Sequence, residues 1–489
     1  MTKTEPIEAW VRAVTSRDAR FDGWVVVGVT STGIYCRPSC PTPVRPKPIN
    51  MSFYLTPAAA QADGFRACKR CAPDSVPGSP EWNRRDDLVA RAIRAIDDGV
   101  VDETGVSGLA TTLHVSSRHL NRILRADVGA SPLALARARR ARIARDLIRS
   151  TDMAFTDVAF ASGFDSVRQF NGTIKEVFAS TPSELRGNGT RASTAGDWIE
   201  VALSYRPPFA AELLWRWLAA HGAPGVEEVV GVLYRRSLLL TGGPAVVELE
   251  DDQAASVVRC RLRLSALTDL PVAINRIRRL LDLDADPRAI NEVLATSDVL
   301  APLVRQHPGL RVPGTVATDE TLTKTILHQQ VSLASAVGSA GRLAREFGRP
   351  LNDPVGGVTH CFPSAEDLAA VEPDQLALPQ ARAATIIRLA RAVQSGELTL
   401  GPFAAARSEA RSALLDTKGV GPWTASVIAL RALGDPDVFC PGDAVLRSVA
   451  AARGLEGDTA IEAAAEQWRP WRSYAMHHLW AKHTTDSDE

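Results

Sequence analysis

The sequence lacks any uninterrupted apolar run long enough to cross a bilayer, and its opening residues Met1–Glu5 lead into no apolar core of the kind that secretory signals carry. Membrane proteins and secreted, disulfide-rich domains are therefore not expected. We expect a cytoplasmic protein with no membrane partner, whose thiols stay reduced and free to bind metal.

Net charge is also absent, because 56 Lys and Arg residues balance 56 Asp and Glu residues. The balance is uneven along the chain: residues 1–190 carry 26 basic against 20 acidic residues, and the remainder carries 30 against 36. The front of the chain is therefore the better candidate for phosphate contact. A chain of 489 residues is too long for one ordinary core, so about three to four units are expected.

Cysteine is scarce, with seven in the chain, but four of the seven fall within residues 36–71. Cys36 and Cys40 form a C-x3-C pair, and Cys68 and Cys71 form a C-x2-C pair. Four thiolates at this spacing suit the closed tetrahedral shell of one structural Zn²⁺, whereas a disulfide framework is typical of small secreted domains. Redox pairs or buried thiols are the remaining alternatives.

The residues around these cysteines carry a recognisable pattern. It consists of the runs Thr32–Cys40 (TGIYCRPSC), Ser52–Tyr54 (SFY) and Gly64–Cys71 (GFRACKRC). The pattern closely resembles the amino-terminal zinc domain of the Ada family, which takes a methyl group from a DNA phosphate onto a zinc-bound cysteine. The resemblance implies that Cys36 is the methyl acceptor and that Thr32, Arg70 and Arg122 contact DNA phosphates.

The charge of such a site explains how it could act on damaged DNA. Four thiolates around a dication leave a formal charge of about −2, which keeps sulfur nucleophilic and repels ordinary phosphodiesters. A methylated phosphate is neutral and can approach, and transfer of its methyl group lowers the charge of the site to about −1. One zinc ion would then be both structural and nucleophile-activating, although the same ligands would also serve a purely structural zinc.

Two helix-turn-helix patterns follow one another in the second region, over residues 108–125 and 158–177. The first places Arg118 and Arg122 on the helix face opposite its apolar residues. A strongly basic helix is expected between the two patterns, over 137–148. A small helical bundle with a solvated, charged face would give the same pattern.

The arrangement resembles an AraC-type DNA-binding domain, including a Gly-Ala-Ser-Pro run at 129–132, Gly-Phe-Asp at 163–165 and Thr181–Pro182. The resemblance implies that residues 118–125 and 166–173 read the major groove of promoter DNA. It also implies a transcriptional activator with RNA polymerase as a partner.

The last third of the chain contains a Gly-Val-Gly turn between two helical stretches. Such a turn bares backbone N–H groups at a helix start, where a phosphate can sit, so Gly419, Gly421 and Thr424 are candidate DNA contacts. Alone, the turn could be a simple helix connection. An aspartate, Asp443, follows it within the run 438–447.

Together these elements resemble the helix-hairpin-helix DNA glycosylases, in which an aspartate follows the hairpin. The likeness is greatest to the AlkA 3-methyladenine glycosylases, and the runs Arg206–Phe209, Arg311–Gly314 and Trp468–Ala475 support it. This resemblance covers nearly everything from Asp197 onward and implies excision of alkylated purines.

The same resemblance implies roles for five side chains. An ionised Asp443 would stabilise the positive charge that grows on the sugar and would orient water. Trp423 and Trp480 would form the walls of a pocket for the flipped cationic base, and Trp217 is a weaker candidate, because tryptophans are more often core than pocket. Gln330 takes the place of the leucine wedge of AlkA and would fill the gap in the duplex with a polar group.

Other departures from the family pattern affect specificity. Val427 stands where AlkA has a pocket tyrosine, which predicts a wider or differently selective pocket. Trp423 replaces the lysine of strand-cutting glycosylases, and no cysteines for an iron–sulfur cluster follow Cys440, so base excision without strand cleavage is expected. The Pro-Cys-His-Arg motif of O6-methylguanine repair in Ada is absent, so Cys260, Cys361 and Cys440 are interpreted as buried or incidental thiols.

These observations predict a multi-domain α+β protein that is predominantly helical. The expected parts are a zinc methyl-acceptor domain (1–80), an AraC-type double helix-turn-helix domain (81–187), a linker (188–196), an AlkA amino-terminal α+β domain (197–312) and an all-α helix-hairpin-helix glycosylase domain (313–489). We expect a monomer, associated with the nucleoid, that combines methylphosphotriester transfer and transcriptional activation with monofunctional base excision from double-stranded DNA. The alternative is a zinc-containing AraC-type regulator fused to a non-catalytic DNA-binding module.

Overall fold

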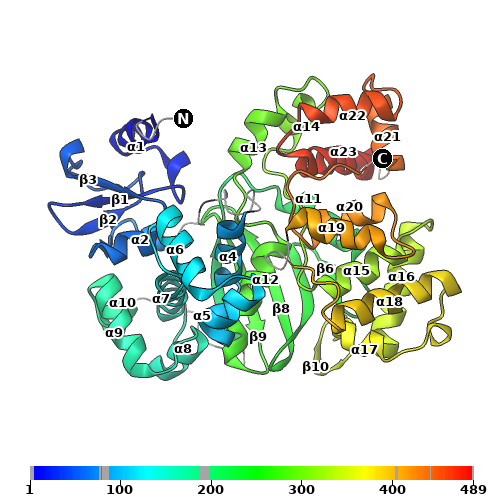
Figure 1. Ribbon diagram of the computed structural model, residues 1–489, viewed down its shortest axis with the longest axis horizontal. Helices are drawn as coiled ribbons and strands as arrows, with labels where there is room; N and C mark the ends of the chain where they lie inside the picture. Colours follow the sequence, from blue (N-terminus) through cyan, green and yellow to red (C-terminus); the bar gives the residue numbers. More distant parts are fainter. Residues whose placement is uncertain are drawn as a thin grey trace. The chain divides into compact units, whose positions relative to one another are not determined.

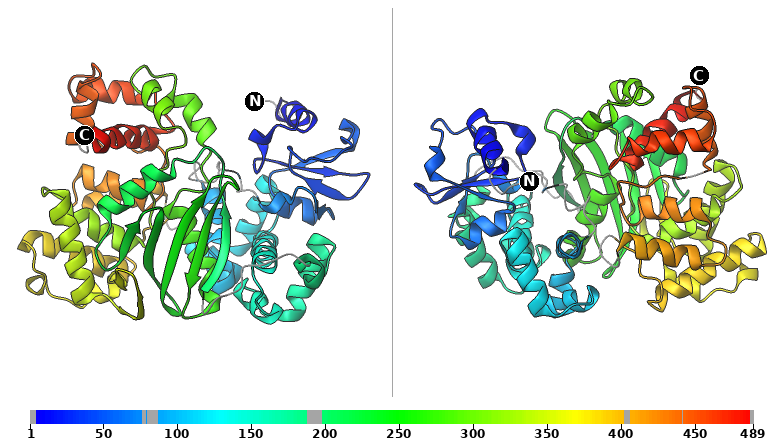
Figure 2. Two further views of the ribbon diagram at one scale, coloured as in Figure 1. Left: turned by 180° about the vertical axis from the view of Figure 1, so that it is seen from behind. Right: turned by 45° about the horizontal axis from the view of Figure 1, so that its top comes forward.

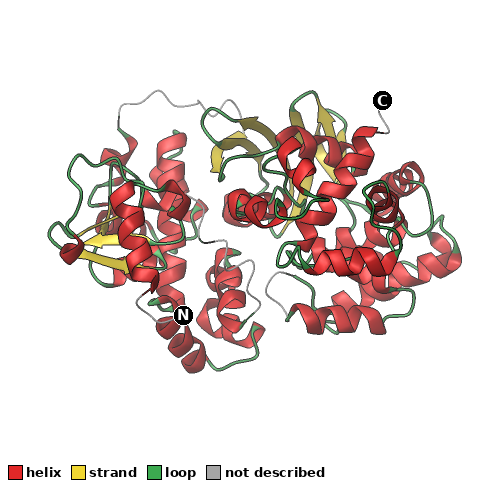
Figure 3. Ribbon diagram, turned by 90° about the horizontal axis from the view of Figure 1, so that it is seen from above, coloured by secondary structure: helices red, strands yellow, loops and turns green. Residues whose placement is uncertain are grey.

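The computed structural model describes residues 5–75, 79, 87–187, 198–401, 406–440 and 442–486. The chain divides into two compact units, one made of residues 1–205 and 266–275 and the other of residues 206–265 and 276–489. Helices predominate, and the strands form smaller groups (Figure 3). Within the described ranges, no helix is long and apolar enough to cross a membrane.

The first unit begins with a small four-stranded sheet. Its elements are α1 (Glu5–Ser16), η1 (Ala19–Phe21), β1 (Val26–Val29), β2 (Ile34–Cys36), η2 (Pro48–Asn50), β3 (Met51–Tyr54), α2 (Pro57–Ala62), β4 (Arg66–Ala67) and η3 (Pro73–Ser75). The strand order is β3-β1-β2-β4, with β1 antiparallel to β2 and β3, and β2 parallel to β4. Because Tyr35 pairs with Ala67 in the parallel pair, the next residue of each segment, Cys36 and Cys68, lies at the same end of the sheet.

The helical part of the first unit contains both predicted helix-turn-helix patterns. Its helices are α4 (Leu88–Asp97), α5 (Val100–Thr112), α6 (Ser117–Val128), α7 (Pro132–Ser150), α8 (Phe155–Ala161), α9 (Val167–Phe178) and α10 (Pro182–Arg186). The side chain of Ser116 caps α6 by accepting from the backbone N–H of His119, and Ser166 caps α9 by accepting from that of Gln169. Each cap begins the second helix of a helix-turn-helix.

The basic helix α7 runs through the middle of this part and contacts the helices on both sides of it in the sequence (Figure 1). A solvated charged face was one interpretation of its sequence, but Arg139, Arg140 and Arg145 are only 4%, 6% and 3% exposed. Arg139 and Arg140 pair with Asp102 of α5 at 2.6 and 2.5 Å. A buried cation needs such a partner, so these arginines hold helices together within the domain.

The remaining elements of the first unit are β5 (Trp198–Ser204) and η4 (Leu267–Asp269), and α12 (Leu270–Leu280) begins in the first unit and ends in the second. The second unit opens with α11 (Ala211–His221) and the strands β6 (Glu227–Val230), β7 (Leu233–Leu240), β8 (Gly243–Asp252) and β9 (Val257–Arg263). These four strands pair in sequence order as an antiparallel meander, visible in both views of Figure 2. Along β9 the buried Val258, Cys260 and Leu262 alternate with exposed arginines, as the two-residue period of a strand requires.

Helices form most of the rest of the second unit. They are α13 (Pro287–Leu294), α14 (Ala301–Gln306), α15 (Thr318–Leu327), α16 (Leu333–Phe347), α17 (Ala365–Ala369), η5 (Pro373–Gln375), α18 (Gln380–Gln394), α19 (Arg407–Asp416), α20 (Pro422–Arg431), α21 (Ala444–Ala451), α22 (Asp458–Glu466) and α23 (Arg472–Asp486). Two apolar clusters hold them, and α20 contributes to both: Ala425 and Ile428 belong to one, Ala429 and Leu430 to the other. The helix that follows the Gly-Val-Gly turn is therefore fixed on two sides.

One hairpin interrupts these helices in a region that the sequence analysis expected to be wholly helical. β10 (Pro350–Val355) pairs antiparallel with β11 (Val358–His360). Pro354 cannot continue a helix, and Gly356 adopts φ 59° in the connecting turn. These two residues favour a strand pair over a helix at this point.

Candidate functional site

The four predicted metal ligands come together at one end of the first sheet. Their sulfur atoms all lie within 4.8 Å of one another, and Cys68 alone of the four is only half-buried. Hydrogen bonding with Cys36 lowers the pKa of Cys40 to about 7, whereas hydrogen bonding with Cys40 and the other thiols raises the pKa of Cys36. Ionisation of Cys40 is thus favoured while that of Cys36 is disfavoured, and a Zn²⁺ ion bound by all four sulfur atoms would stabilise all of them as thiolates.

The turn between Cys36 and Cys40 is held by a carboxylate that the sequence did not single out. Asp22 Oδ1 accepts a hydrogen bond from the backbone N–H of Ser39 at 3.0 Å, and its Oδ2 lies 3.5 Å from Nε of Arg37. Asp22 itself is buried. It fixes the spacing of the C-x3-C pair from outside the metal shell, in the manner of other outer-shell groups at metal sites.

A cavity of about 450 Å³ adjoins the cysteines and is lined by Thr32, Cys36 and Arg70 together. Three of the residues implied by the Ada resemblance are thus neighbours in space. Its rim also carries Arg45 and Lys47, two exposed cations from the loop after Cys40 that sequence reasoning missed. These two residues lie in a proline-rich loop, where no helix or strand periodicity predicts which side chains share a face. The positive charge of the loop was the one feature of the sequence that could have indicated them.

The third implied phosphate contact, Arg122, does not line this cavity. It lies exposed on α6 beside Arg118, while Leu120 and Leu124 of the same helix are fully buried. On α9 the predicted reading segment 166–173 is exposed at Arg168, but its last residue, Thr173, is only 2% exposed. Each second helix therefore keeps an exposed face that begins in its first turn.

In the second unit, three N–H donors hold the carboxylate of Asp443. Nε1 of Trp423 donates to Oδ2 at 2.9 Å, and Nε1 of Trp480 donates to Oδ1 at 3.1 Å. The backbone N–H of Leu446 donates to Oδ1 at 2.8 Å, so Asp443 also caps α21. Asp443 is 9% exposed, and both indoles are half-buried.

Trp217 does not touch Asp443, because the side chain of His477 lies between Trp217 and Trp480. The imidazole of His221 stacks on its ring at 4.0 Å, and the guanidinium of Arg431 lies 4.3 Å from the ring centroid. The ring of His477 meets Trp217 edge-on at 6.1 Å and Trp480 edge-on at 5.0 Å. His221 and Arg431 therefore cover much of the Trp217 ring surface, and the contact between Trp217 and the Asp443 site passes through His477.

The sequence analysis missed the two histidines in this cluster. Burial lowers the pKa of His477 to about 3 and that of His221 to about 3, so both rings are neutral near pH 7. No sequence motif contains these two histidines, and only the packing of their rings against Trp217 and Trp480 places them in this cluster.

The Gly-Val-Gly turn is fastened by Gln329, which follows the end of α15. Its Nε2 donates to the carbonyl of Gly419 and to Oγ1 of Thr424, both at 3.0 Å. Gly419 adopts φ 96°, and a Cβ there would lie 2.2 Å from Oγ1 of Thr385. Thr424 is buried, whereas Gly421 is exposed at the first turn of α20. These contacts hold the turn in one conformation. At Gly421, which has no side chain, the turn exposes its backbone.

Gln330 stands exposed beside the fastened turn, with φ 54°. The residues that follow it are exposed as well, including two large apolar side chains, Val331 (36%) and Leu333 (38%). Sequence reasoning named Gln330 but missed these two neighbours, whose signal was an apolar residue at the first and third positions after it.

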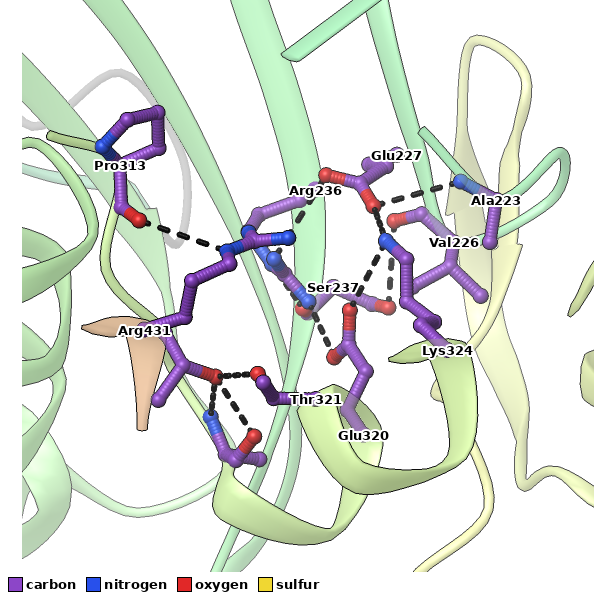
Figure 4. A network of polar contacts seen from close by, with 12 residues as sticks. Ala223, Val226, Glu227, Arg236, Ser237, Pro313, Glu320, Thr321, Lys324 and Arg431 are labelled. Carbon is purple, nitrogen blue, oxygen red and sulfur yellow. Dashed lines mark hydrogen bonds and ion pairs between the residues drawn. The ribbon is translucent and has the colours of Figure 1, made fainter. Parts of the chain in front are cut away.

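A buried network of charges anchors α15 below this edge (Figure 4). Nζ of Lys324 lies 2.6 Å from Glu227 of β6, and Arg236 of β7 lies 2.7 Å from Glu320 of α15. Arg431 donates to the carbonyl of Pro313 at 3.4 Å beside this network. These pairs join the meander sheet to α15, the helix that precedes Gln329 and Gln330.

Four family models match the chain in succession. They are "Metal binding domain of Ada" (residues 9–74), "Helix-turn-helix domain" (109–188), "AlkA N-terminal domain" (200–317) and "HhH-GPD superfamily base excision DNA repair protein" (323–473). They confirm the predicted resemblances and the multi-domain fold class. Together with the four-cysteine cluster, they confirm a single Zn²⁺ as the cofactor.

Two relatives match over nearly all of their own length. A "Probable bifunctional transcriptional activator/DNA repair enzyme AlkA" of Mycobacterium tuberculosis is 49% identical over 97% of this chain and 96% of its own. "DNA-3-methyladenine glycosylase 2" of Escherichia coli is 32% identical over 59% of this chain and 99% of its own. A solved 3-methyladenine DNA-glycosylase from Archaeoglobus fulgidus shares the fold with a TM-score of 0.50 at 20% identity, over 57% of this chain and 96% of its own. The chain belongs to the family of bifunctional transcriptional activator/DNA repair enzymes in which an Ada-type zinc domain precedes an AlkA-type glycosylase.

Proposed function

We propose that the second unit hydrolyses the N-glycosidic bond of alkylated purines, such as 3-methyladenine, in double-stranded DNA, without cutting the strand. The observation that carries this proposal is Asp443, whose two oxygens are each held by an indole N–H. The bond between C1′ and the base nitrogen breaks, and its electron pair leaves with the cationic base. The carboxylate of Asp443 stabilises the positive sugar, and water adds its oxygen to C1′ and releases a proton.

The neighbouring residues take supporting roles in this reaction. Trp423 and Trp480 orient the carboxylate and offer their ring faces to the flipped base, for which a cation–π contact contributes about 0.5–2 kcal/mol. Trp217 supports Trp480 through His477, since its own ring is already stacked. Gln330 fills the gap that the flipped nucleotide leaves, and the backbone at Gly419 and Gly421, fastened through Thr424, meets the DNA phosphates.

The first unit acts as a methyl acceptor and transcriptional activator in this proposal. When bound, zinc keeps the four thiolates anionic near neutral pH. The sulfur of Cys36 attacks the methyl carbon of a methylphosphotriester, the carbon–oxygen bond breaks, and a phosphodiester leaves with the electron pair. Thr32 and Arg70, which line the same cavity, position the phosphate.

The modified protein then binds promoter DNA through α6 and α9, with Arg118 and Arg122 on the open face of α6. RNA polymerase is the proposed partner of the activator, which acts as a monomer on the nucleoid in the reducing cytoplasm. The domain limits given above, 1–80, 81–187, 197–312 and 313–489, are part of this proposal.

One experiment tests both activities. The protein is incubated with duplex DNA that carries labelled methyl groups on bases and phosphates, and label on protein is separated from free labelled base. We expect the wild type to give both labelled protein and free labelled base. Cys36→Ser should give no labelled protein, and Asp443→Asn should give no free labelled base. Absence of free base would favour the alternative, a zinc-containing regulator fused to a non-catalytic DNA-binding module.

A further inference from the structure

A buried chain of polar side chains leads from the methyl-acceptor strand toward the helix-turn-helix domain. The hydroxyl of Tyr35 donates to Oδ1 of Asp74 at 2.7 Å and accepts from Nε2 of Gln61 at 2.9 Å. Tyr35 is 0% exposed and Asp74 6%. Tyr35 immediately precedes Cys36 in β2, so any movement of that strand moves the phenol.

The chain continues into α7 through an ion pair. Oδ2 of Asp74 lies 3.7 Å from a guanidinium nitrogen of Arg145, and both side chains are about 5% exposed or less. Neither of these two atoms has a hydrogen bond within the described ranges. The pair is therefore close enough to attract strongly in a buried setting, but it is not locked by hydrogen-bond geometry. We call Gln61, Tyr35, Asp74 and Arg145 the Tyr35 relay.

The helix at the far end of the relay holds both helix-turn-helix elements. Besides the pairs of Arg139 and Arg140 with Asp102 of α5, Arg137 donates to Oε1 of Glu176 on α9 at 2.8 Å. The guanidinium of Arg145 lies 5.6 Å from the ring centroid of Phe178, the last residue of α9. The helix α7 also packs directly against α6 and α9, so a displacement of α7 would move both DNA-reading helices.

An apolar contact runs beside the relay. Ala58 and Ala59 of α2 pack with Ala130, two residues before α7, in one small cluster. A Cβ at Gly129 would lie 3.1 Å from Cβ of Ala59, so the two surfaces approach closely. Close packing transmits small shifts, because interiors are dense and resist compression.

We propose that Tyr35 is a positioning residue through which the chemical state of the Cys36 sulfur sets the affinity of the helix-turn-helix domain for DNA. The proposal rests on the proposed methyl acceptance and names its route of regulation. Charge loss at Cys36 shifts β2, Tyr35 carries the shift to Asp74, and Arg145 carries it to α7. Coupling between two sites requires such a physical link, and its usual size is about 5- to 150-fold in affinity.

The test compares four full-length, zinc-loaded proteins: wild type, Cys36→Ser, Tyr35→Phe and the double variant. Replacing Cys36 by serine removes one negative thiolate, as methylation does, without needing the methyl-transfer reaction. The measured quantity is the dissociation constant for a duplex that the wild type selects from a random-sequence pool. We expect Cys36→Ser to tighten binding by about fivefold or more in the wild-type background and to leave it almost unchanged in the Tyr35→Phe background.

Tyr54→Phe is the matched control, because Tyr54 OH also donates to a carboxylate, that of Asp63 at 2.9 Å, but at an exposed site in the same sheet. It should leave the effect of Cys36→Ser intact. Zinc content and melting temperature show whether each variant is folded. If Tyr35→Phe loses zinc, Asp74→Asn replaces it, since the amide keeps the shape and still accepts from Tyr35 but removes the charge that faces Arg145.

Two results overturn the proposal: a Cys36→Ser effect that persists in the Tyr35→Phe background, or no effect of Cys36→Ser on affinity in the wild type. A separate arm measures the mass of wild-type protein after incubation with methylphosphotriester DNA. Absence of a methyl mass there contradicts methyl acceptance itself, while the four-protein comparison still decides whether the Tyr35 relay couples the two sites.

Discussion

Trp423 and Asp443 are joined by a hydrogen bond of 2.9 Å from the indole nitrogen to a carboxylate oxygen, although twenty positions separate them in the chain. Trp423 belongs to the first turn of α20, and Asp443 caps α21. The bond connects the helix after the Gly-Val-Gly turn to the carboxylate. A residue that was expected to line a pocket thus also orients the proposed catalytic group.

Asp443→Asn should lower the rate of methylpurine release by about 10²-fold or more, because a neutral amide cannot stabilise the developing positive sugar. Binding of alkylated DNA should change little. The rate is measured as free base released in a single turnover, and binding by a gel shift. Asp416→Asn, at an exposed carboxylate at the end of α19, is the control and should keep the full rate. Undiminished release by Asp443→Asn would mean that another group acts.

Trp423→Phe keeps an aromatic face but removes the N–H donor to Asp443. A hydrogen bond to a charged group is worth about 1.5–3 kcal/mol, so we expect release to slow by roughly 10- to 100-fold. Trp423→Ala should lose more, since the ring face is then lost as well. Single-turnover rates of the wild type and the two variants separate the contributions. A Trp423→Phe rate equal to that of the wild type would show that the hydrogen bond is unimportant.

Gly419→Ala should reduce stability and weaken binding of the glycosylase part to DNA. The added Cβ would sit 2.2 Å from Oγ1 of Thr385, at a φ of 96° that L-residues avoid. Each such strain costs on the order of 1–3 kcal/mol. Gly396→Ala is a matched control, because Gly396 has φ 78° with open space around its Cβ position. Urea unfolding midpoints compare the two, and equal losses would mean that the clash is relieved without consequence.

Stability should fall as the pH drops below about 6.5, because His221 and His477 stay neutral when folded. Burial lowers the pKa of each to about 3, whereas the unfolded chain takes up these protons near the ordinary histidine pKa. Their contribution is therefore complete above that value and is lost as the pH falls toward about 3. Each site contributes a slope of at most about 1.4 kcal/mol per pH unit.

His477→Leu should flatten this slope by about one proton, measured as the unfolding free energy between pH 7 and pH 5. The control variant is His360→Gln, at a partly exposed histidine in the same unit. An unaltered slope in His477→Leu would show that this imidazole is protonated in the folded state.

Local features of the sequence were enough to predict several parts of the molecule. The spacing of the four cysteines predicted the cluster, because two short turns of fixed length bring each pair together. Ser116 and Ser166 mark the starts of α6 and α9, because a serine hydroxyl satisfies the free N–H groups of a first turn. The roles assigned to individual site residues stay predictions until the variants are measured.

Other features depend on residues that lie far apart in the chain. The arginines of α7 carry the same charge whether they face solvent or a buried Asp102, and only the packed helices decide which. In the same way, only the folded structure shows that the ring of His477 contacts both Trp217 and Trp480.

The sequence by itself therefore determined the metal ligands, the helix starts and the family, and it singled out Asp443 as the proposed catalytic carboxylate, since each depends on short spacing or on a motif. The tertiary structure alone decided which charges are buried in pairs, which rings are stacked, and that Tyr35 reaches α7 through Asp74. The physical reason is that burial and partner choice are properties of surfaces brought together by folding, and residue type does not encode them locally.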